Sequence, residues 1–245
     1  MSIQTVRNDY PGLYGKLVEG AFIMDDSINE AQRLKECINM IDNNSNQYIL
    51  HINPTLDCNF SCWYCYENHV PNSKMDTEVL NAVKLYISYI LGKPEIKHIE
   101  LGFFGGEPLF HFNAIAKDII NHAGAICRET NKKLFVHFTS NGVLLTDDTI
   151  KFLSEFTCGF QITLDGGKEC HDQTRFHKNK KGSFDDIVKN IYKLVNVNIE
   201  VIVRVNYTSS NIDSVNTILD SFREIPADKK IHLIGKTQNI CAKWA

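Results

Sequence analysis

Three cysteines in one short stretch are the residues of this chain best suited to chemistry. Cys58, Cys62 and Cys65 have the spacing Cys-x3-Cys-x2-Cys, and Tyr64 directly precedes the last of them. Thiolates are soft ligands that select zinc, copper(I) or iron–sulfur clusters. Three thiolates on one short loop suit three irons on one face of a [4Fe–4S] cube, and the fourth iron then stays open to a small molecule. The spacing therefore predicts such a cluster at these cysteines.

A zinc-binding structural module is the alternative. Structural zinc takes four ligands, which are usually supplied by two Cys/His pairs. The chain has one cysteine triplet and no second pair of this kind, although His51 and His69 lie near enough in sequence to complete a zinc site. The other cysteines are isolated and fit best as small buried apolar residues: they are Cys37, Cys127, Cys158, Cys170 and Cys241.

The composition is that of an ordinary globular protein. The 245 residues are 43% hydrophobic and 22% charged, with a net charge of −3, and they show no basic stripe that would favour nucleic acid or an anionic membrane. Residues 1–9 are polar, unlike a signal peptide, and the longest apolar run, residues 85–91, is too short to span a bilayer. We therefore expect a cytoplasmic protein, in which clustered thiols indicate metal binding or catalysis.

The elements that must position the cysteines begin at residue 48. Residues 1–47 are predicted to be a helical appendage and linker, with a capping signal at residues 25–27 and apolar residues at helical spacing over 28–41. Strands and helices alternate from there on. Strands are predicted over residues 48–52, 98–104, 134–138, 160–164, 199–205 and 230–234, and helices over 76–91, 113–129, 146–156, 183–195 and 212–223, with caps at Asp76, Thr146 and Ser183.

Repeats of this length imply parallel strands joined by right-handed crossovers. Six such strands form either an open, doubly wound sheet or a partial barrel. The cysteines and residues 105–108, 140–142, 163–166 and 205–207 each follow a different strand. In a parallel barrel the carboxyl ends of the strands meet at one mouth, where active sites are built. We therefore predict an α/β fold, a partial (β/α)6 TIM-like barrel with parallel strands over residues 48–235.

The cysteine motif, Gly105-Gly106-Glu107-Pro108 and Thr163-Leu164-Asp165-Gly166 together resemble the radical SAM superfamily. The stretch Cys58-Asn59-Phe60-Ser61-Cys62-Trp63-Tyr64-Cys65-Tyr66-Glu67 is similar to the peptide- and protein-modifying branch that carries a SPASM extension, such as anaerobic sulfatase maturases. The loop that contains His171, Asp172 and Arg175 is also typical of that branch. The resemblance covers about residues 48–235.

The resemblance implies two cofactors: a [4Fe–4S] cluster on Cys58, Cys62 and Cys65, and S-adenosylmethionine (SAM) on the open iron. A guanidinium fork matches a carboxylate, so Arg175 is the candidate partner of the methionyl carboxylate, with a solvated surface charge as its alternative. Asn141 and Asp165 fit equally well as turn residues. The residues expected around SAM are Tyr64, Gly105, Gly106, Glu107, Pro108, Ser140, Asn141, Thr163, Asp165, Arg175 and Val205, and Asn206 is a further candidate beside Val205 on the adenine side.

The activity that the resemblance implies is reductive cleavage of SAM to a 5′-deoxyadenosyl radical. That radical would abstract a hydrogen atom from a side chain of a peptide or protein substrate. A flavodoxin or ferredoxin reductant is implied as well, and no residue is assigned as catalytic.

The chain departs from the SPASM-type branch after the sixth strand. A SPASM region brings further cysteines, but only Cys241 follows, within a polar tail over residues 236–245. We therefore expect a radical SAM core that is truncated before the SPASM region. An inactive fragment of a SPASM maturase is a further alternative.

Overall fold

The computed structural model describes residues 3–20, 22–24, 28–42, 46–208, 211–226 and 228–237. It divides into two compact units, residues 1–45 and 46–245. The first unit contains three helices, α1 (Ile3–Asp9), α2 (Pro11–Glu19) and α3 (Glu30–Asp42). Helix α3 overlaps the predicted helical stretch over residues 28–41, whereas no individual helix was predicted at α1 and α2. The predicted cap at residues 25–27 lies outside the described residues.

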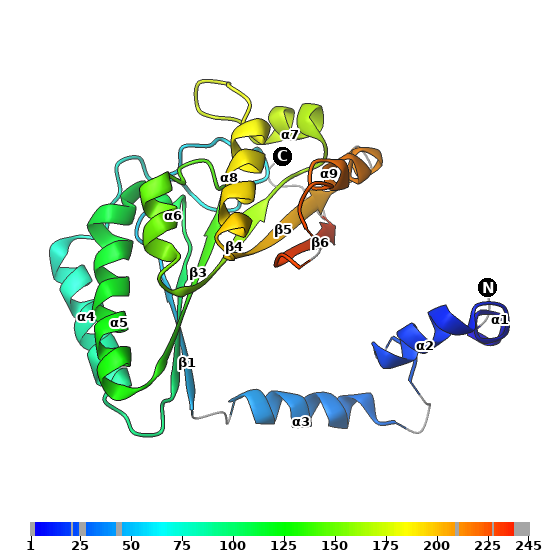
Figure 1. Cartoon of the computed structure of the whole chain (residues 1–245), viewed down its shortest axis with the longest axis horizontal. Helices are drawn as coiled ribbons and strands as arrows, with labels where there is room; N and C mark the ends of the chain where they lie inside the picture. Colours follow the sequence, from blue (N-terminus) through cyan, green and yellow to red (C-terminus); the bar gives the residue numbers. More distant parts are fainter. Residues whose placement is uncertain are drawn as a thin grey trace. The chain divides into compact units, whose positions relative to one another are not determined.

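The second unit is built on a sheet of six parallel strands (Figure 1). The strands pair in the order of the sequence, β1-β2-β3-β4-β5-β6, and the sheet is open between β1 and β6. A doubly wound sheet would reverse its order at a switch point, so this order confirms the predicted partial barrel. The strands are β1 (Gln47–Ile52), β2 (His98–Phe103), β3 (Lys133–Ser140), β4 (Thr157–Thr163), β5 (Glu200–Tyr207) and β6 (Ile231–Thr237).

Helices and short turns connect the strands, and two of the three predicted caps, at Asp76 and Thr146, are confirmed. Asp76 caps α4 by accepting a hydrogen bond from the Val79 amide (2.8 Å), and Thr146 caps α6 in the same way. None of the helices in the part of the chain that the structure describes is long and apolar enough to cross a membrane. The helices are α4 (Thr77–Leu91), α5 (Lys117–Thr130), α6 (Asp147–Leu153), α7 (Lys168–Thr174), α8 (Phe184–Asn196) and α9 (Asn216–Asp220), with one-turn segments η1 (Pro108–His111), η2 (Phe112–Ala116) and η3 (Ile212–Ser214).

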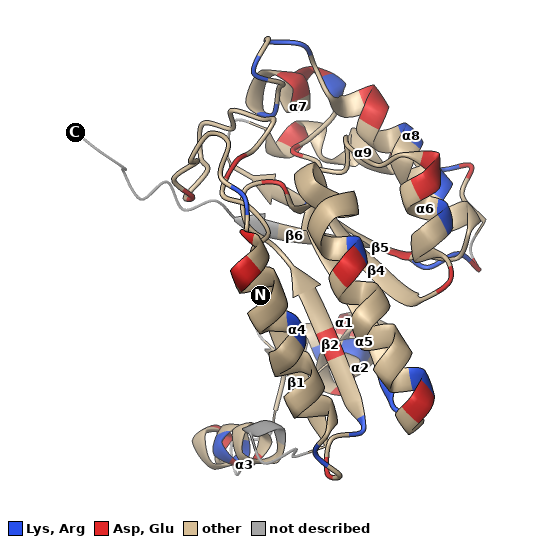
Figure 2. Ribbon diagram, turned by 90° about the vertical axis from the view of Figure 1, so that its left-hand side faces the viewer, with Lys and Arg blue, Asp and Glu red and all other residues tan. Residues whose placement is uncertain are grey.

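The two faces of the sheet differ in burial. On one face nearly all residues of β2 to β5 are buried, and Phe103, Phe138 and Phe160 stack from β2 to β4 with ring centroids 4.9 and 5.0 Å apart. The alternate residues point to the opposite, open face, where Glu100 and Phe135 are half-buried. Charged residues of both signs are interspersed along α4, α5 and α8 (Figure 2). The face on which the alternate strand residues are buried is therefore the face that packs into the hydrophobic core.

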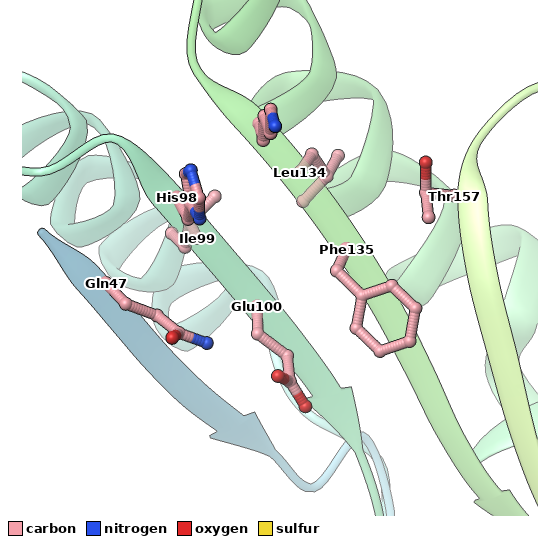
Figure 3. Close-up of a pocket in the computed structure, with 8 residues that line it drawn as sticks. Gln47, His98, Ile99, Glu100, Leu134, Phe135 and Thr157 are labelled. Atoms are coloured by element: carbon pink, nitrogen blue, oxygen red, sulfur yellow. The ribbon is translucent and has the colours of Figure 1, made fainter. Parts of the chain in front are cut away.

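A pocket of 360 Å³ lies on the open face at the amino ends of β1 to β4 (Figure 3). Gln47, Glu100 and Phe135 are among its lining residues. The cysteines follow the carboxyl end of β1, so this pocket lies at the opposite end of the sheet from them.

Three connections differ from the sequence prediction. A helix was expected from residue 113, but the chain first forms η1 and then a π-helical turn, η2, and α5 begins only at Lys117. The helix expected over residues 212–223 is reduced to η3 and α9, and the expected polar loop after β4 contains α7.

The predicted cap of α8 is also wrong. The Ser183 side chain does not cap the helix, because its hydroxyl donates to the Arg175 carbonyl (2.8 Å) and lies 2.9 Å from His171 Nε2. Asp172 takes its place, with Oδ1 accepting from the amides of Ser183 (2.7 Å) and Phe184 (2.9 Å).

Candidate cofactor site at the carboxyl ends of the strands

The cysteine loop after β1 is held by a buried carboxylate, Asp57. Its Oδ1 accepts from the Cys58 amide (2.8 Å) and from Lys178 Nζ (3.0 Å), and its Oδ2 accepts from the Asn72 amide (2.8 Å). The hydrogen bond from Asn72, followed by that from Lys178, lowers the pKa of Asp57 below its usual value. Sequence reasoning did not single out Asp57, although an Asp directly before the first cysteine is a signal for a turn of this kind.

The loop is also braced by the segment that follows α7. Phe60 and His177 form an antiparallel bridge, and the Lys178 amide donates to the Asn59 carbonyl at 3.1 Å. The bridge brings residues from after β4 against the cysteines after β1.

The three cysteines are free thiols on this loop. Cys58 is buried, and its Sγ accepts from the Phe60 amide at 3.4 Å, while Cys65 Sγ lies 3.4 Å from His69 Nε2. Burial raises the pKa of Cys58 to about 12 and raises that of Cys62 as well, so a metal that binds here must displace protons.

Three free thiols on one loop are a set of donors of the kind that iron–sulfur clusters take. Among the residues that the structure describes, no group of three or more His, Cys, Asp or Glu side chains is arranged to hold a single metal ion.

The Gly-Gly-Glu-Pro segment after β2 packs directly on the cysteine loop. Gly105 has a φ of +100°, and a Cβ there would lie 2.7 Å from the Thr55 carbonyl oxygen. A Cβ at Gly106 would overlap the Asp57 carbonyl, which accepts from the Glu107 amide at 2.8 Å. The two glycines are thus required for this close approach, whereas the sequence suggested an approach to the ligand.

Glu107 turns inward and joins the loops after β2 and β3. It is fully buried; its Oε1 accepts from Ser140 Oγ (2.7 Å) and the Leu109 amide (3.1 Å), and its Oε2 accepts from the Asn141 amide (2.8 Å). Burial raises its pKa, although these three hydrogen bonds oppose the shift. The Ser140 hydroxyl also accepts from the Gly142 amide at 2.9 Å, so Ser140 holds this junction together.

A polar cluster formed by Tyr64, Asp165, Arg175 and Asn206 lies beside the cysteine loop. The Tyr64 hydroxyl donates to Asp165 Oδ2 and accepts from Arg175 Nη1 (2.6 Å) and Asn206 Nδ2 (3.3 Å). Asp165 Oδ1 accepts from the Asn206 amide at 3.1 Å. Burial raises the pKa of Tyr64, which keeps the hydroxyl protonated. All four residues were candidates from the sequence, and they meet here from separate parts of the chain.

Asn206 is the fourth member of this polar cluster. It was a candidate together with its neighbour Val205, but the Val205 side chain is buried in the apolar core. Successive strand residues point to opposite faces, so the two side chains lie on different sides of the sheet. Thr163 ends β4 and is buried beside Arg204 of β5.

Arg175 is the feature that indicates an anionic ligand. Its side chain is buried over the Phe60 ring, its Nε has no hydrogen-bond partner, and it forms no ion pair with any residue in the described part of the chain. A buried cation is costly unless it is paired. Its positive charge lowers the pKa of Cys62, although burial raises that pKa by more. The residues present therefore fit an anionic group beside the cysteine loop.

His171 braces the back of this cluster as a neutral imidazole. Its Nδ1 accepts from the Asp165 amide (3.2 Å), so its Nε2 carries the proton and donates to Ser183 Oγ (2.9 Å). Burial, with the nearby charges of Arg175 and Lys168, lowers the pKa of His171 well below its usual value.

The fold and the site together define the class of protein. The sequence profile of the Radical SAM superfamily matches residues 52–224. The chain belongs to the radical SAM superfamily, whose cofactors are SAM and a [4Fe–4S] cluster. The predicted family, fold and pair of cofactors are confirmed.

Comparison with individual proteins shows which ones this chain resembles in sequence. It is 32% identical over 168 residues to a cysteine-type anaerobic sulfatase-maturating enzyme of Clostridium novyi (strain NT), a match that covers 65% of this chain and 44% of that protein. It is 29% identical over 185 residues to the sporulation killing factor maturation protein SkfB of Bacillus subtilis (strain 168), covering 75% and 41%. The chain thus spans less than half the length of these two relatives.

A solved structure shows the same fold. Native anSMEcpe with bound AdoMet and Kp18Cys peptide superimposes with a TM-score of 0.65 at 24% identity, covering 77% of this chain and 51% of that one.

Proposed function

We propose that this chain binds a [4Fe–4S] cluster and SAM and abstracts a hydrogen atom from a side chain of a peptide or protein. The buried Arg175 guanidinium carries this proposal, because it lies beside the loop of three free thiols and its Nε has no hydrogen-bond partner. When bound, the two cofactors supply a one-electron reductive cleavage of SAM that generates a strong hydrogen-atom acceptor.

The chain's own residues have separable tasks in this proposal. Cys58, Cys62 and Cys65 would each hold one iron. Arg175 would pair with the methionyl carboxylate, and Tyr64 keeps the guanidinium in place through its 2.6 Å hydrogen bond. Glu107 holds together the loops that form the rim and leaves the backbone edge of residues 105–108 to the methionyl amino group.

The kind of substrate is inferred from relatives. One curated relative is a sporulation killing factor maturation protein, and the solved neighbour holds a peptide together with AdoMet. We infer a peptide or protein substrate in the cytoplasm, with a flavodoxin or ferredoxin as reductant.

The test is formation of 5′-deoxyadenosine from SAM after anaerobic reconstitution with iron and sulfide, with dithionite as reductant. The wild type should form product, and the Cys58→Ala/Cys62→Ala/Cys65→Ala variant should form none. Cys37→Ala/Cys170→Ala is the matched control, because both thiols lie outside the cysteine loop, and it should retain full activity. Equal product from the wild type and the triple variant would refute the proposal.

The same samples distinguish the alternatives. A chain that holds zinc, with no broad absorption near about 400 nm from thiolate-bound iron–sulfur, would support the structural zinc module. A chain that binds the cluster and SAM but forms no 5′-deoxyadenosine would support the inactive fragment.

A further inference from the structure

The Asn141 side chain links the end of β3 to the cysteine loop. Its Oδ1 accepts from the Val143 amide at 3.1 Å, which fixes the orientation of the side-chain amide. Its Nδ2 therefore faces the cysteine loop, where it donates to Asn59 Oδ1 at 2.8 Å and lies 3.9 Å from Cys58 Sγ. Asn141 is only 5% exposed, and both ends of its side-chain amide are engaged inside the protein.

Two N–H groups of different origin thus approach the Cys58 sulfur. The Phe60 amide, at 3.4 Å, belongs to the cysteine loop itself and forms with it. The Asn141 donor comes from 83 residues further along the chain and depends on the packing of β3 beside β2. The bond from the Val143 amide is the turn that the sequence allowed for Asn141, whereas its approach to Cys58 was not expected from the sequence.

We propose that Asn141 is a positioning residue that raises the reduction potential of the cluster by donating a hydrogen bond to the Cys58 thiolate. The inference rests on the proposed function, because it requires a cluster at this thiolate. A reduced cluster carries more negative charge on its sulfurs, so an N–H donor stabilises the reduced form more than the oxidised form. Loss of the donor should therefore make the potential more negative.

Asn190 supplies a matched control. It is buried to the same degree (6% exposed), and its Nδ2 donates to the Gly142 carbonyl (2.8 Å) and the Val143 carbonyl (3.4 Å). It therefore holds the same loop from α8. The partners of Asn190 are carbonyl oxygens, so Asn190→Ala loosens the loop and leaves the hydrogen bonds to Cys58 in place.

The experiment measures the midpoint potential of the reconstituted cluster by titration monitored by electron paramagnetic resonance, together with iron and sulfide content. Asn141→Ala should bind a full cluster whose potential lies below that of the wild type, while Asn190→Ala keeps the wild-type value. Asn141→Asp retains the oxygen that accepts from Val143 and the backbone bond to Glu107, so it decides the outcome if Asn141→Ala fails to fold. It should also lower the potential.

Three results would overturn the inference. A wild-type potential in Asn141→Ala, or in Asn141→Asp where only that variant folds, would show that the donor has no effect on the cluster. An equal shift in Asn190→Ala would assign the effect to the position of the loop. Loss of the cluster from both Asn141 variants would give Asn141 a role in assembly of the site. A wild type that binds no iron–sulfur cluster would instead refute the proposed function.

Discussion

Different interactions stabilise two regions of the molecule. One is the row of phenylalanines on the helix-covered face, and the other is the set of buried polar residues at the carboxyl ends of the strands, called here the polar rim. Phe103, Phe138 and Phe160 are fully buried and stack on neighbouring strands. A few residues further along, Glu107 and Asp165 are equally buried, but each accepts hydrogen bonds from named partners in loops far away in sequence. In the row a lost side chain leaves a cavity, whereas in the rim it leaves a buried partner unpaired.

The largest effect on stability is expected in the phenylalanine row. Phe138→Ala removes the ring that stacks on both of its neighbours, and such a cavity costs about 3–5 kcal/mol. Phe135→Ala is the control on the open face, where the ring is half-buried. Urea unfolding should show a much smaller loss for Phe135→Ala. Equal losses would contradict the assignment of the core to one face.

The polar rim should give the next largest effect. Tyr64→Phe removes one hydroxyl, and with it a hydrogen bond to the buried Asp165 carboxylate and a hydrogen bond from the buried Arg175 guanidinium. Hydrogen bonds to charged groups contribute about 1.5–3 kcal/mol, so we expect a loss of about 2–3 kcal/mol in the free energy of unfolding.

Tyr192→Phe is the matched control for Tyr64→Phe. The Tyr192 hydroxyl makes a hydrogen bond with a neutral partner, the Ser221 carbonyl (3.0 Å), and its removal should cost about 1 kcal/mol. A smaller loss for Tyr64→Phe than for Tyr192→Phe would show that the polar cluster does not stabilise the fold.

The contrast between row and rim also explains what the sequence could reveal. Alternating and helical periodicity predicted all six strands and α4, α5, α6 and α8, because burial of one face is a local pattern. The strand ends that carry polar motifs were also predictable. Two features were not predictable from the sequence: Glu107 points inward, and Asp172 rather than the Ser183 side chain caps α8. Each depends on a partner that lies tens of residues or a full loop away in the sequence. The assignment of individual site residues to SAM stays a prediction.

His171 allows the rim to be tested by pH. Its pKa in the folded state lies well below the value of about 6.5 in an unfolded chain, chiefly because it is buried. As the pH falls below about 6.5, the unfolded chain takes up a proton that folded His171 does not, so stability is present above this pH and lost below it. The slope from one such group is at most about 1.4 kcal/mol per pH unit.

Urea unfolding of the wild type between about pH 5 and pH 8 measures this slope. His171→Gln should flatten it by up to that amount. Burial also lowers the pKa of His137 on the open face, but by less, so His137→Gln should flatten the slope less. A slope that is unchanged in His171→Gln would show that the imbalance of protons arises elsewhere.

The smallest effect is expected where a surface lysine pairs with the rim. Lys178 is half-exposed, and its 3.0 Å ion pair joins it to Asp57, whose side chain is 10% exposed. Lys178→Met should lower the free energy of unfolding by less than about 1 kcal/mol, since one partner remains in water. The loss should shrink further at about 1 M salt, where charges are screened beyond about 3 Å. Lys193→Met, which breaks a pair with the 84% exposed Asp147, is the control and should have the weaker effect. A larger loss of unfolding free energy in Lys193→Met than in Lys178→Met would contradict this prediction. So would a loss in Lys178→Met that does not change with salt, and Asp57 would then hold the cysteine loop through its backbone partners alone.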